Sequence, residues 1–336
     1  MNMKRLLMIA TGGTIASQYT EDGLCPQIES DALLSYVPGY EQFCAVDVVQ
    51  PFNLDSTNIY AKQWIILEDI IEKNYSDYDG FIICHGTDTM AYTAAALSYL
   101  IQNSKKPIVI TGAQKPIDLN ITDARTNLMD SLRFASHDRA HGVNIVFGGV
   151  VICGTRAKKE RSKSYNAFSS INYPQIAVIQ DHRIIFYIDD KKEEDEVTFY
   201  HELKDNVFLL KLMPGRDGSI LKALSGMYDA IVIESFGVGG LPSYEEDNFY
   251  KAILRCVKRG TMVVMATQVT HEGSDMDIYQ VGKTMKREFH LPESYDMTLE
   301  AVVAKTMWAL AQKDKDFMEL FYKTINHDML FFEENN

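Results

Sequence analysis

The sequence has no long hydrophobic run. No apolar segment in its 336 residues approaches the ~20 residues that span a bilayer. Near the N-terminus, the apolar residues give way to Thr11-Gly12-Gly13, short of the ~7–15 residues that the core of a signal peptide requires. We therefore interpret Leu6–Ala10 as a buried strand and expect a cytoplasmic protein with no membrane partner.

Cysteine and positive charge are also scarce. The five cysteines are scattered and form no CxxC pair, so they offer no zinc site and are typical of a reducing compartment. Lysine and arginine number 33 against 46 aspartate and glutamate residues, which gives a formal net charge of -13. Because a surface this acidic repels phosphate backbones, we expect no nucleic acid partner.

Two common nucleotide-binding patterns are missing as well. Gly12 and Gly13 follow the first expected strand, but neither the dinucleotide fingerprint GxGxxG nor the Walker lysine spacing is present. The glycine pair is therefore either a tight strand exit or a loop whose backbone approaches a ligand closely.

What the sequence does contain is an alternation of short apolar runs and helix-like segments. The expected strands of the first part are Leu6–Ala10, Val46–Val49, Phe81–Cys84, Ile108–Ile110 and Val143–Cys153. The expected helices between them are Ile59–Asn74, Thr89–Gln102 and Asp123–His137. Such alternation predicts an α/β fold with a mostly parallel sheet and helices on both faces.

Eight consecutive charged residues, 189–196, interrupt this pattern. Because such a run cannot be buried, we expect a charged linker over residues 189–205. It separates an N-terminal domain, residues 1–188, from a smaller C-terminal α/β domain, residues 206–336. The expected strands of the second domain are Val207–Leu212, Ala230–Ile233 and Met262–Met265, and its expected helices are Tyr244–Lys258 and Leu299–Gln312.

Four polar loops carry the candidate chemistry: residues 11–14, 55–57, 85–89 and 154–159. Ligands of parallel sheets bind beyond the carboxyl ends of the strands, where such loops meet. Each loop also has a structural explanation: a turn for 11–14, a helix cap for 55–57 and for 85–89, and a solvated basic loop for 154–159. The segment His85–Thr89 favours function, because one cap accounts for only one of its polar residues.

The residue types in these loops fit nucleophilic catalysis by an alcohol. A threonine hydroxyl is a poor nucleophile at neutral pH and needs a base or a charged neighbour. A lysine can act as that base, and an aspartate can orient it. The loops contain all three types of residue, which predicts that they come together at one edge of the sheet.

Several segments resemble bacterial L-asparaginases. Residues 10–15 and 85–90 are similar to the two signature segments of that family, and residues 111–114, 123–127, 165–168, 235–239 and 296–301 also match. The similarity runs from residue 5 to about residue 312, and the absence of a leader points to the cytoplasmic, type I branch. The resemblance implies a two-domain asparaginase-like fold whose larger N-terminal domain is flavodoxin-like.

The resemblance also implies a catalytic role for each of several residues. Thr14 would attack the side-chain amide of L-asparagine to form a β-aspartyl ester, with release of ammonia, and water would hydrolyse the ester. Thr87, Asp88 and Lys159 would form the second catalytic group. Lys159 is chosen over its neighbour Lys158 because it lies six residues before the segment that begins at Tyr165, as in the family.

Further residues would bind the substrate. Ser56, with Asp55 and Thr57 close by, would hold the α-carboxylate. Asp88 would accept hydrogen bonds from the ammonium group, Thr87 would position the amide or the water, and Ala113 would lie near the scissile amide. Residues 18–26 resemble the lid that closes over the site in this family.

The sequence departs from the family at two places. Many relatives carry a tyrosine just after a glycine in the lid, where this chain has Leu24. We expect Tyr279 of the second domain to substitute, with Tyr19 as the alternative. Some type I enzymes have a threonine before the catalytic lysine, linked to allosteric asparagine binding. This chain has Lys158 there, and Gly240 where those relatives have an asparagine, so cooperative control is not expected.

By the same resemblance, the chain is expected to form a homodimer or homotetramer, because a neighbouring subunit completes the site in this family. No metal and no organic cofactor are expected. The sequence does not decide whether the chain also has a weak glutaminase activity. Two rival functions are a tRNA-dependent amidotransferase subunit, which usually has an extra N-terminal domain not expected here, and an inactive binding module for small amino acids.

Overall fold

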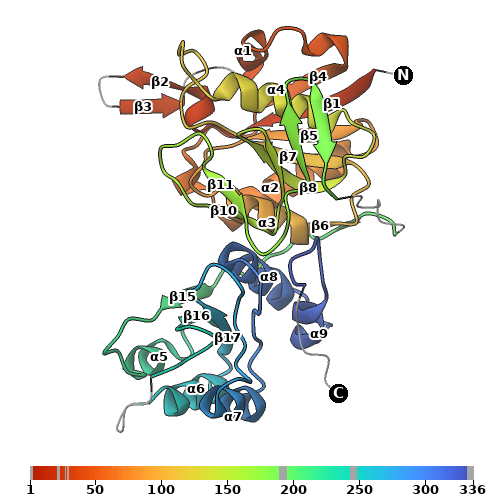
Figure 1. The fold of residues 1–336 in the computed structure, drawn as a ribbon. Helices are drawn as coiled ribbons and strands as arrows, with labels where there is room; N and C mark the ends of the chain where they lie inside the picture. The colour runs from red at the N-terminus through yellow and green to blue at the C-terminus, as the bar shows by residue number, and fades with distance from the viewer. Residues whose placement is uncertain are drawn as a thin grey trace. The chain divides into compact units, whose positions relative to one another are not determined.

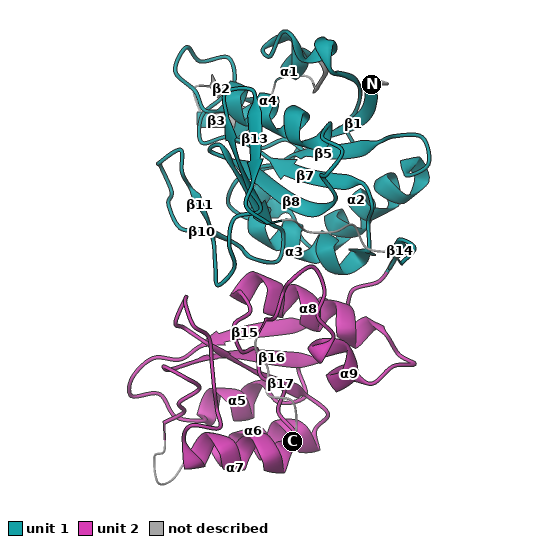
Figure 2. Cartoon of the chain, turned by 45° about the vertical axis from the view of Figure 1, so that its right-hand side comes forward, with its two compact units in different colours: residues 1–201 teal, residues 202–336 magenta. Residues whose placement is uncertain are grey.

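The computed structural model describes residues 3–20, 23–26, 28, 30–188, 195–242 and 248–330. The chain divides into two compact units, residues 1–201 and 202–336, which Figure 2 shows in different colours. The division falls inside the linker expected from the charged run. Residues 189–194 of that linker lie outside the described residues.

A single large sheet forms the centre of the first unit (Figure 1). Its strand order is β13-β12-β9-β8-β7-β5-β1-β4. The parallel part contains β1 (Lys4–Ala10), β4 (Cys44–Val49), β5 (Gly80–Cys84), β7 (Pro107–Thr111) and β8 (Gly142–Phe147). Numbered along the chain, these strands have the order 2-1-3-4-5, which is the flavodoxin-like arrangement.

The prediction of one strand over Val143–Cys153 was wrong. The segment forms two antiparallel strands, β8 and β9 (Val150–Cys153), joined by a tight turn. Gly148 and Gly149 occupy this turn with φ angles of 60° and 77°. Glycine takes such positive φ angles without steric cost, and two of them in succession are typical of a two-residue hairpin. Two more antiparallel strands, β12 (Ala177–Gln180) and β13 (Arg183–Phe186), continue the sheet.

Helices pack against both faces of this sheet. They are α1 (Ser30–Ser35), α2 (Ala61–Asn74), α3 (Met90–Leu100) and α4 (Ala124–Ala135). Leu6 and Met8 of β1 belong to the apolar cluster that includes Leu128 of α4. Leu7, between them, is equally buried but belongs to the opposite face, because successive side chains of a strand alternate. The predicted helices 59–74, 89–102 and 123–137 therefore exist, with ends displaced by one or two residues.

Short elements surround the sheet and shape its loops. They are the 3-10 helices η1 (Thr14–Ala16), η2 (Tyr40–Gln42) and η3 (Ser56–Asn58), and the paired strands β2 (Ser17–Thr20) with β3 (Gly23–Pro26), β6 (Ile101–Gln102) with β14 (Thr198–Phe199), and β10 (Ala157–Lys159) with β11 (Phe168–Ser170). The sequence indicated none of these pairs.

The second unit has a smaller parallel sheet of order β15-β16-β17. Its elements are β15 (Val207–Lys211), β16 (Ala230–Ser235), β17 (Met262–Thr267), α5 (Ser219–Leu224), α6 (Phe249–Lys258), α7 (Gln280–Phe289), α8 (Leu299–Ala311) and α9 (Phe317–Tyr322). The three predicted strands and helix 299–312 are present, whereas residues 244–247 of the predicted helix 244–258 lie outside the described residues. The α/β fold class, with a larger N-terminal and a smaller C-terminal parallel sheet, is confirmed.

None of the helices in the described part of the chain is both long enough and apolar enough to span a bilayer.

Candidate active site

Three of the predicted loops are joined by backbone hydrogen bonds at the carboxyl edge of the large sheet. The amide of Thr11, just after β1, donates to the carbonyl of Cys84 at the end of β5, with a distance of 3.0 Å. The amide of Gly13 donates to the carbonyl of Leu54 at 3.0 Å. The expectation that loops 11–14, 55–57 and 85–89 meet is therefore correct for the backbone.

Gly13 and Gly86 allow these loops to touch. The φ angle of Gly13 is +76°, and a Cβ at this position would lie 2.4 Å from the Gly86 amide nitrogen. Because no side chain fits there, the loop that carries Thr14 packs directly against the loop that carries Thr87. Thr14 itself is half-buried and begins η1.

Ser56 belongs to the same contact. Its side chain is 3% exposed, and its Oγ accepts a hydrogen bond from the Asp88 amide at 3.3 Å. Asp55 caps η3, because its Oδ1 accepts hydrogen bonds from the amide and hydroxyl of Thr57 at 2.8 and 2.7 Å. The structural explanation for this loop is thus correct for Asp55, while Ser56 faces the 85–89 loop.

The densest polar contact in these loops is centred on Lys159. Its Nζ donates to Thr87 Oγ1 at 2.7 Å and to Asp88 Oδ1 at 2.6 Å. The Lys159 side chain is 16% exposed and that of Asp88 is 57% exposed, so the ion pair lies at an opening to solvent. Neither Thr87 nor Asp88 is the N-cap of α3, which is Thr89. The alternative in which Asp88 or Thr87 merely caps the following helix is therefore wrong.

Lys159 does not reach this edge in the way the sequence suggested. Because β9 runs antiparallel to β8, its carboxyl end lies beside the start of β8, at the opposite edge of the sheet. The chain then returns along β10, which packs against α3 and ends at Lys159. Thr87 and Asp88 immediately precede α3, so β10 delivers Lys159 to them. The segment is also not a solvated loop, since Arg156 is fully buried.

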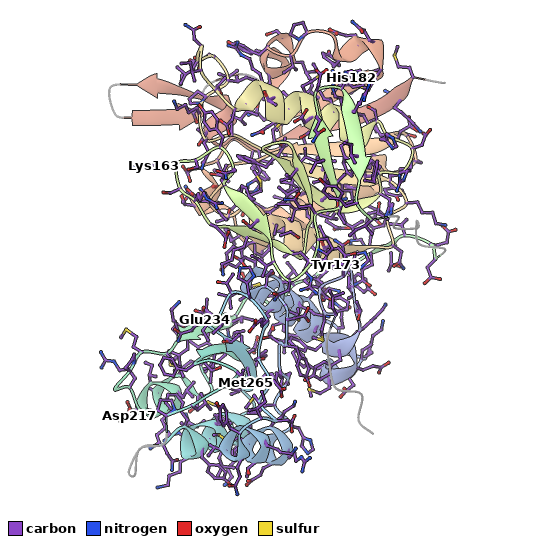
Figure 3. The ribbon with its side chains drawn as sticks, in the orientation of Figure 1. Lys163, Tyr173, His182, Asp217, Glu234 and Met265 are labelled. Atoms are coloured by element: carbon purple, nitrogen blue, oxygen red, sulfur yellow. The ribbon has the colours of Figure 1, made fainter. Side chains whose placement is uncertain are left out.

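Gln114 is a site residue that the sequence reasoning missed. Its Oε1 accepts a hydrogen bond from Thr87 Oγ1 at 3.3 Å, and its Nε2 donates to the carbonyls of Arg161 and Ser164. Gln114 therefore links Thr87 to the loop between β10 and β11, which carries Lys163 (Figure 3). The only sequence feature that pointed to Gln114 was its position in segment 111–114, which follows an expected strand.

His85 is a buried structural residue beside the candidate site. Its Nδ1 lies 2.6 Å from the Gly86 carbonyl and must donate to it, so Nε2 accepts from Thr93 Oγ1 at 2.9 Å. Trp64 Nε1 in turn donates to Thr93 Oγ1 at 2.9 Å. Burial lowers the pKa of His85 to about 4. The imidazole is therefore neutral at pH 7 and fixes the carbonyl of Gly86.

The remaining predicted residues lie in three different settings. Ala113 is fully buried just after β7. Tyr279 belongs to the second unit, where it is the N-cap residue of α7 and 62% exposed. Tyr19 lies in β2, and its backbone pairs with Leu24 of β3, so the expected lid is a hairpin over its described residues.

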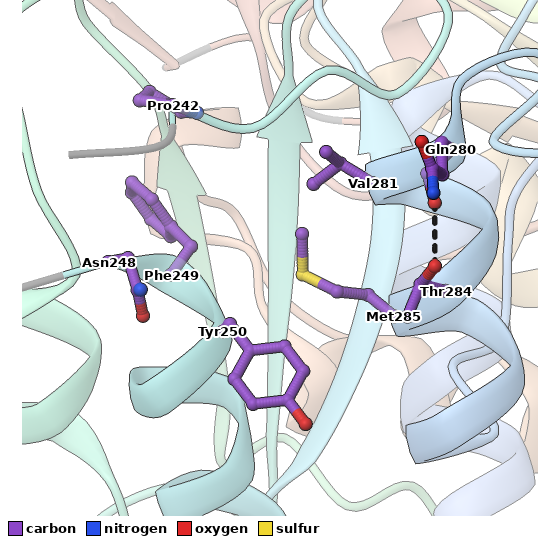
Figure 4. Close-up of a pocket in the computed structure, with 8 residues that line it drawn as sticks. All are labelled: Pro242, Asn248, Phe249, Tyr250, Gln280, Val281, Thr284 and Met285. Carbon is purple, nitrogen blue, oxygen red and sulfur yellow. Dashed lines mark hydrogen bonds between the residues drawn. The ribbon is translucent and has the colours of Figure 1, made fainter. Parts of the chain in front are cut away.

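Two cavities lie away from these loops. In the second unit a cavity of about 230 Å³ opens between α6 and α7 (Figure 4), where Phe249, Val281 and Met285 make its wall apolar. In the first unit a cavity of about 550 Å³ is lined by side chains that include Arg133 and Asp130. Neither contains the threonine and lysine side chains that the chemistry requires.

Comparisons with known proteins agree on one family. The family described as "Asparaginase, N-terminal" matches residues 5–192, and "Glutaminase/Asparaginase C-terminal domain" matches residues 206–320. An L-asparaginase of Thermococcus kodakarensis is 36% identical over 307 residues, which cover 91% of this chain and 92% of that protein. A glutamyl-tRNA(Gln) amidotransferase subunit of Pyrococcus furiosus is 33% identical over 318 residues, 91% of this chain and 72% of that protein.

Solved structures show the same relationship. The thermostable L-asparaginase from Thermococcus kodakarensis superposes with a TM-score of 0.91 and 34% identity, over 98% of this chain and 100% of that one. L-asparaginase I from Vibrio cholerae superposes with a TM-score of 0.86 and 26% identity, also over 98% of this chain and 100% of that one.

Proposed function

The chain belongs to the asparaginase family, and on this premise we propose that it is an L-asparaginase, which hydrolyses L-asparagine to L-aspartate and ammonia. The two-domain asparaginase-like fold predicted from the sequence is confirmed. The observation that carries the proposal is the placement of Lys159 Nζ within hydrogen-bonding distance of both Thr87 and Asp88. The type I, cytoplasmic branch stays a prediction.

In the proposed mechanism Thr14 is the nucleophile. Its oxygen attacks the side-chain carbonyl carbon of asparagine, the hydroxyl proton passes to the leaving nitrogen, and the C–N bond breaks to release ammonia. A β-aspartyl ester of Thr14 remains. Water then attacks the ester carbonyl, which regenerates the hydroxyl and releases aspartate. The contact of Gly13 with Gly86 supports a short distance from this loop to Thr87.

Thr87, Lys159 and Asp88 would assist both steps. Thr87 would position the amide and then the attacking water. Lys159 would be the basic member of this group, acting through Thr87 Oγ1. Asp88 would hold Lys159 in place and bind the substrate ammonium group through charge-assisted hydrogen bonds. Ser56, beside Asp55 and Thr57, would bind the α-carboxylate, with Ala113 near the scissile amide.

The test is ammonia release from free L-asparagine by the purified chain alone. We expect turnover without tRNA or a partner protein, and we expect Thr14→Ala to reduce kcat by at least about 1000-fold while circular dichroism and Tm stay unchanged. Near-wild-type turnover by T14A would contradict the assignment of the nucleophile. L-glutamine is assayed in parallel to settle the side activity.

A second candidate function, that of an amidotransferase subunit that supplies ammonia to a partner, has specific support. The glutamyl-tRNA(Gln) amidotransferase relative from Pyrococcus furiosus matches this chain at 33% identity over 72% of its own length. A protein that only supplies ammonia to a partner would release little ammonia from free asparagine. Turnover that appears only when tRNA and a partner are added would therefore favour this second function.

A further inference from the structure

A cluster of two carboxylates and one imidazole lies on α2, outside the loops of the candidate site. Glu68 and Glu72 are four residues apart, so both lie on one face of the helix. His201 follows β14 and is the last residue of the first compact unit. One ligand atom from each of the three side chains lies within 4.8 Å of the others.

The topology of the first unit explains why these residues meet. β14 pairs with β6, which directly follows α3, and α3 packs against α2. The amide of Tyr200 donates to the carbonyl of Leu100 at 2.8 Å, which continues this attachment beyond β14. His201 is therefore held by backbone pairing against the helix that carries Glu68.

Among the described residues, the buried carboxylate of Glu68 has a single neighbouring donor for its two oxygens. The side chain is fully buried, and among the described residues its Oε1 has no hydrogen-bond partner. The other oxygen, Oε2, accepts from His201 Nδ1 at 3.3 Å. Oε1 also lies 3.2 Å from His201 Nδ1, so one imidazole nitrogen serves both oxygens, which is costly for a fully buried carboxylate.

The spacing of the three groups fits a small cation. His201 Nδ1 lies 3.2 Å from Glu68 Oε1 and 3.8 Å from Glu72 Oε2. Tetrahedral zinc with bonds of about 2.0–2.1 Å separates its ligands by roughly 3.3 Å. An imidazole with carboxylates suits zinc, whereas magnesium and calcium take sets of oxygen ligands.

We propose that Glu68, Glu72 and His201 bind one Zn²⁺ ion per chain, with water as the fourth ligand. The ion supplies positive charge beside the buried Glu68 carboxylate, and Glu72 and His201 are exposed enough for the ion to enter from solvent. It fastens the end of the first unit to α2. The role is structural and independent of the proposed hydrolysis.

The test is calorimetric titration of Zn²⁺ into the full chain after removal of metals with a chelator. We expect one Zn²⁺ per chain, at least tenfold weaker binding in Glu72→Gln and in His201→Asn, and much weaker binding of Mg²⁺. Saturating Zn²⁺ should raise Tm by roughly 3–8 °C in the parent but not in H201N. The two exposed ligands are the primary variants, because Glu68→Gln alters a buried group.

His182→Asn is the matched control. His182 lies in the turn between β12 and β13 (Figure 3), where its Nδ1 is 2.8 Å from Asp181 Oδ2 and both side chains are exposed. This variant should bind Zn²⁺ like the parent. The proposal is overturned if the parent binds no Zn²⁺, if E72Q and H201N bind as tightly as the parent, or if H182N weakens binding equally. Equal affinity for Mg²⁺ would also overturn it.

Discussion

Lys158 and Lys159 are neighbours in sequence, but β10 separates their roles. Side chains alternate along a strand, so the two point to opposite faces of the β10–β11 ribbon. Lys159 pairs with Phe168 and Lys158 with Ser169 in this ribbon. Only Lys159 reaches Thr87 Oγ1 and Asp88 Oδ1.

Replacement of each lysine by methionine therefore distinguishes the loss of a catalytic amine from the loss of one positive charge near the site. Lys159→Met should lower kcat by about 10²–10⁴-fold, the usual contribution of a positioned acid or base. Lys158→Met removes the same charge one residue away and should stay within roughly threefold of the parent. Steady-state rates on L-asparagine provide the comparison. Equal losses in the two variants would refute the assignment of Lys159.

A buried acid should make stability depend on pH. Burial raises the pKa of Asp130 to about 7, and Arg133 opposes the shift only partly. The folded state therefore binds more protons than the unfolded state between about pH 4 and pH 7, and this contribution to stability is lost as the pH rises through 7.

Asp130→Asn removes this dependence. As the pH rises from 5.5 to 8, the free energy of unfolding of the variant should increase relative to that of the parent. The increase is about 1.4 kcal/mol for each pH unit that lies below the pKa of Asp130 in this range. Urea denaturation at the two pH values measures the gain. Asp181→Asn is the control, because Asp181 lines the same cavity with an exposed side chain, so the variant removes a carboxylate that is not buried. An equal gain in D181N would argue against a titrating Asp130.

At the scale of elements, the candidate site depends on close contact between loops. Gly13 has a φ of +76° and no room for a Cβ, while Gly260 has a φ of +78° and no atom within 4 Å of the Cβ position. Both glycines have a positive φ, so alanine strains the backbone at each, by about 1–2 kcal/mol at Gly260. The strain is larger at Gly13, because its ψ of -178° places it in a region that essentially only glycine occupies. Only Gly13 has the additional steric clash.

Gly13→Ala and Gly260→Ala therefore form a matched pair. G260A should lower stability by about 1–2 kcal/mol and leave kcat unchanged. G13A should in addition displace the loop of Thr14 from that of Thr87 and reduce kcat by at least about 100-fold, since small misplacement of reacting groups is costly. Denaturation curves and steady-state rates measure both effects. Normal turnover by G13A would show that the loop contact is dispensable.

Some of the strands and helices could be predicted from the sequence, and others could not. Strands β1, β5 and β7 and helices α2 to α4 were predictable, because each is a strongly periodic segment bounded by turn residues. The hairpin of β8 and β9 was missed because Val143–Cys153 is almost entirely apolar, although Gly148-Gly149 marked the turn. That error reversed the direction of β9 and hence the route by which Lys159 reaches the site.

At the scale of the whole molecule, two expectations from the sequence combine: Tyr279 of the second unit completes the site, and a neighbouring subunit provides the residue that does so. Tyr279→Phe should lower kcat, whereas an unchanged rate would direct attention to Tyr19. If the site is shared, refolding a mixture of T14A and Y279F chains should recover activity, up to roughly a quarter of the wild-type value in random dimers. Activity assays and light scattering measure the recovery and the oligomer.

A mixture of T14A and K159M chains is the control for this experiment. Both residues belong to the first unit, so no hybrid contains a complete site and no recovery is expected. Recovery in this control, or none with Y279F when Y279F alone is impaired, would rule out a site shared in this way.

The sequence alone determined the kinds of element, because periodicity is a property of short segments, and its resemblance to the asparaginases supplied the candidate catalytic residues. Thr14, Thr87, Asp88 and Lys159 were named without coordinates. Only the tertiary structure decided how the loops that carry them come together. The contact of Gly13 with Gly86, the return of β10 along α3 and the position of Gln114 arise from pairing between distant segments. Such pairing is set by packing of the whole sheet, which no local pattern encodes.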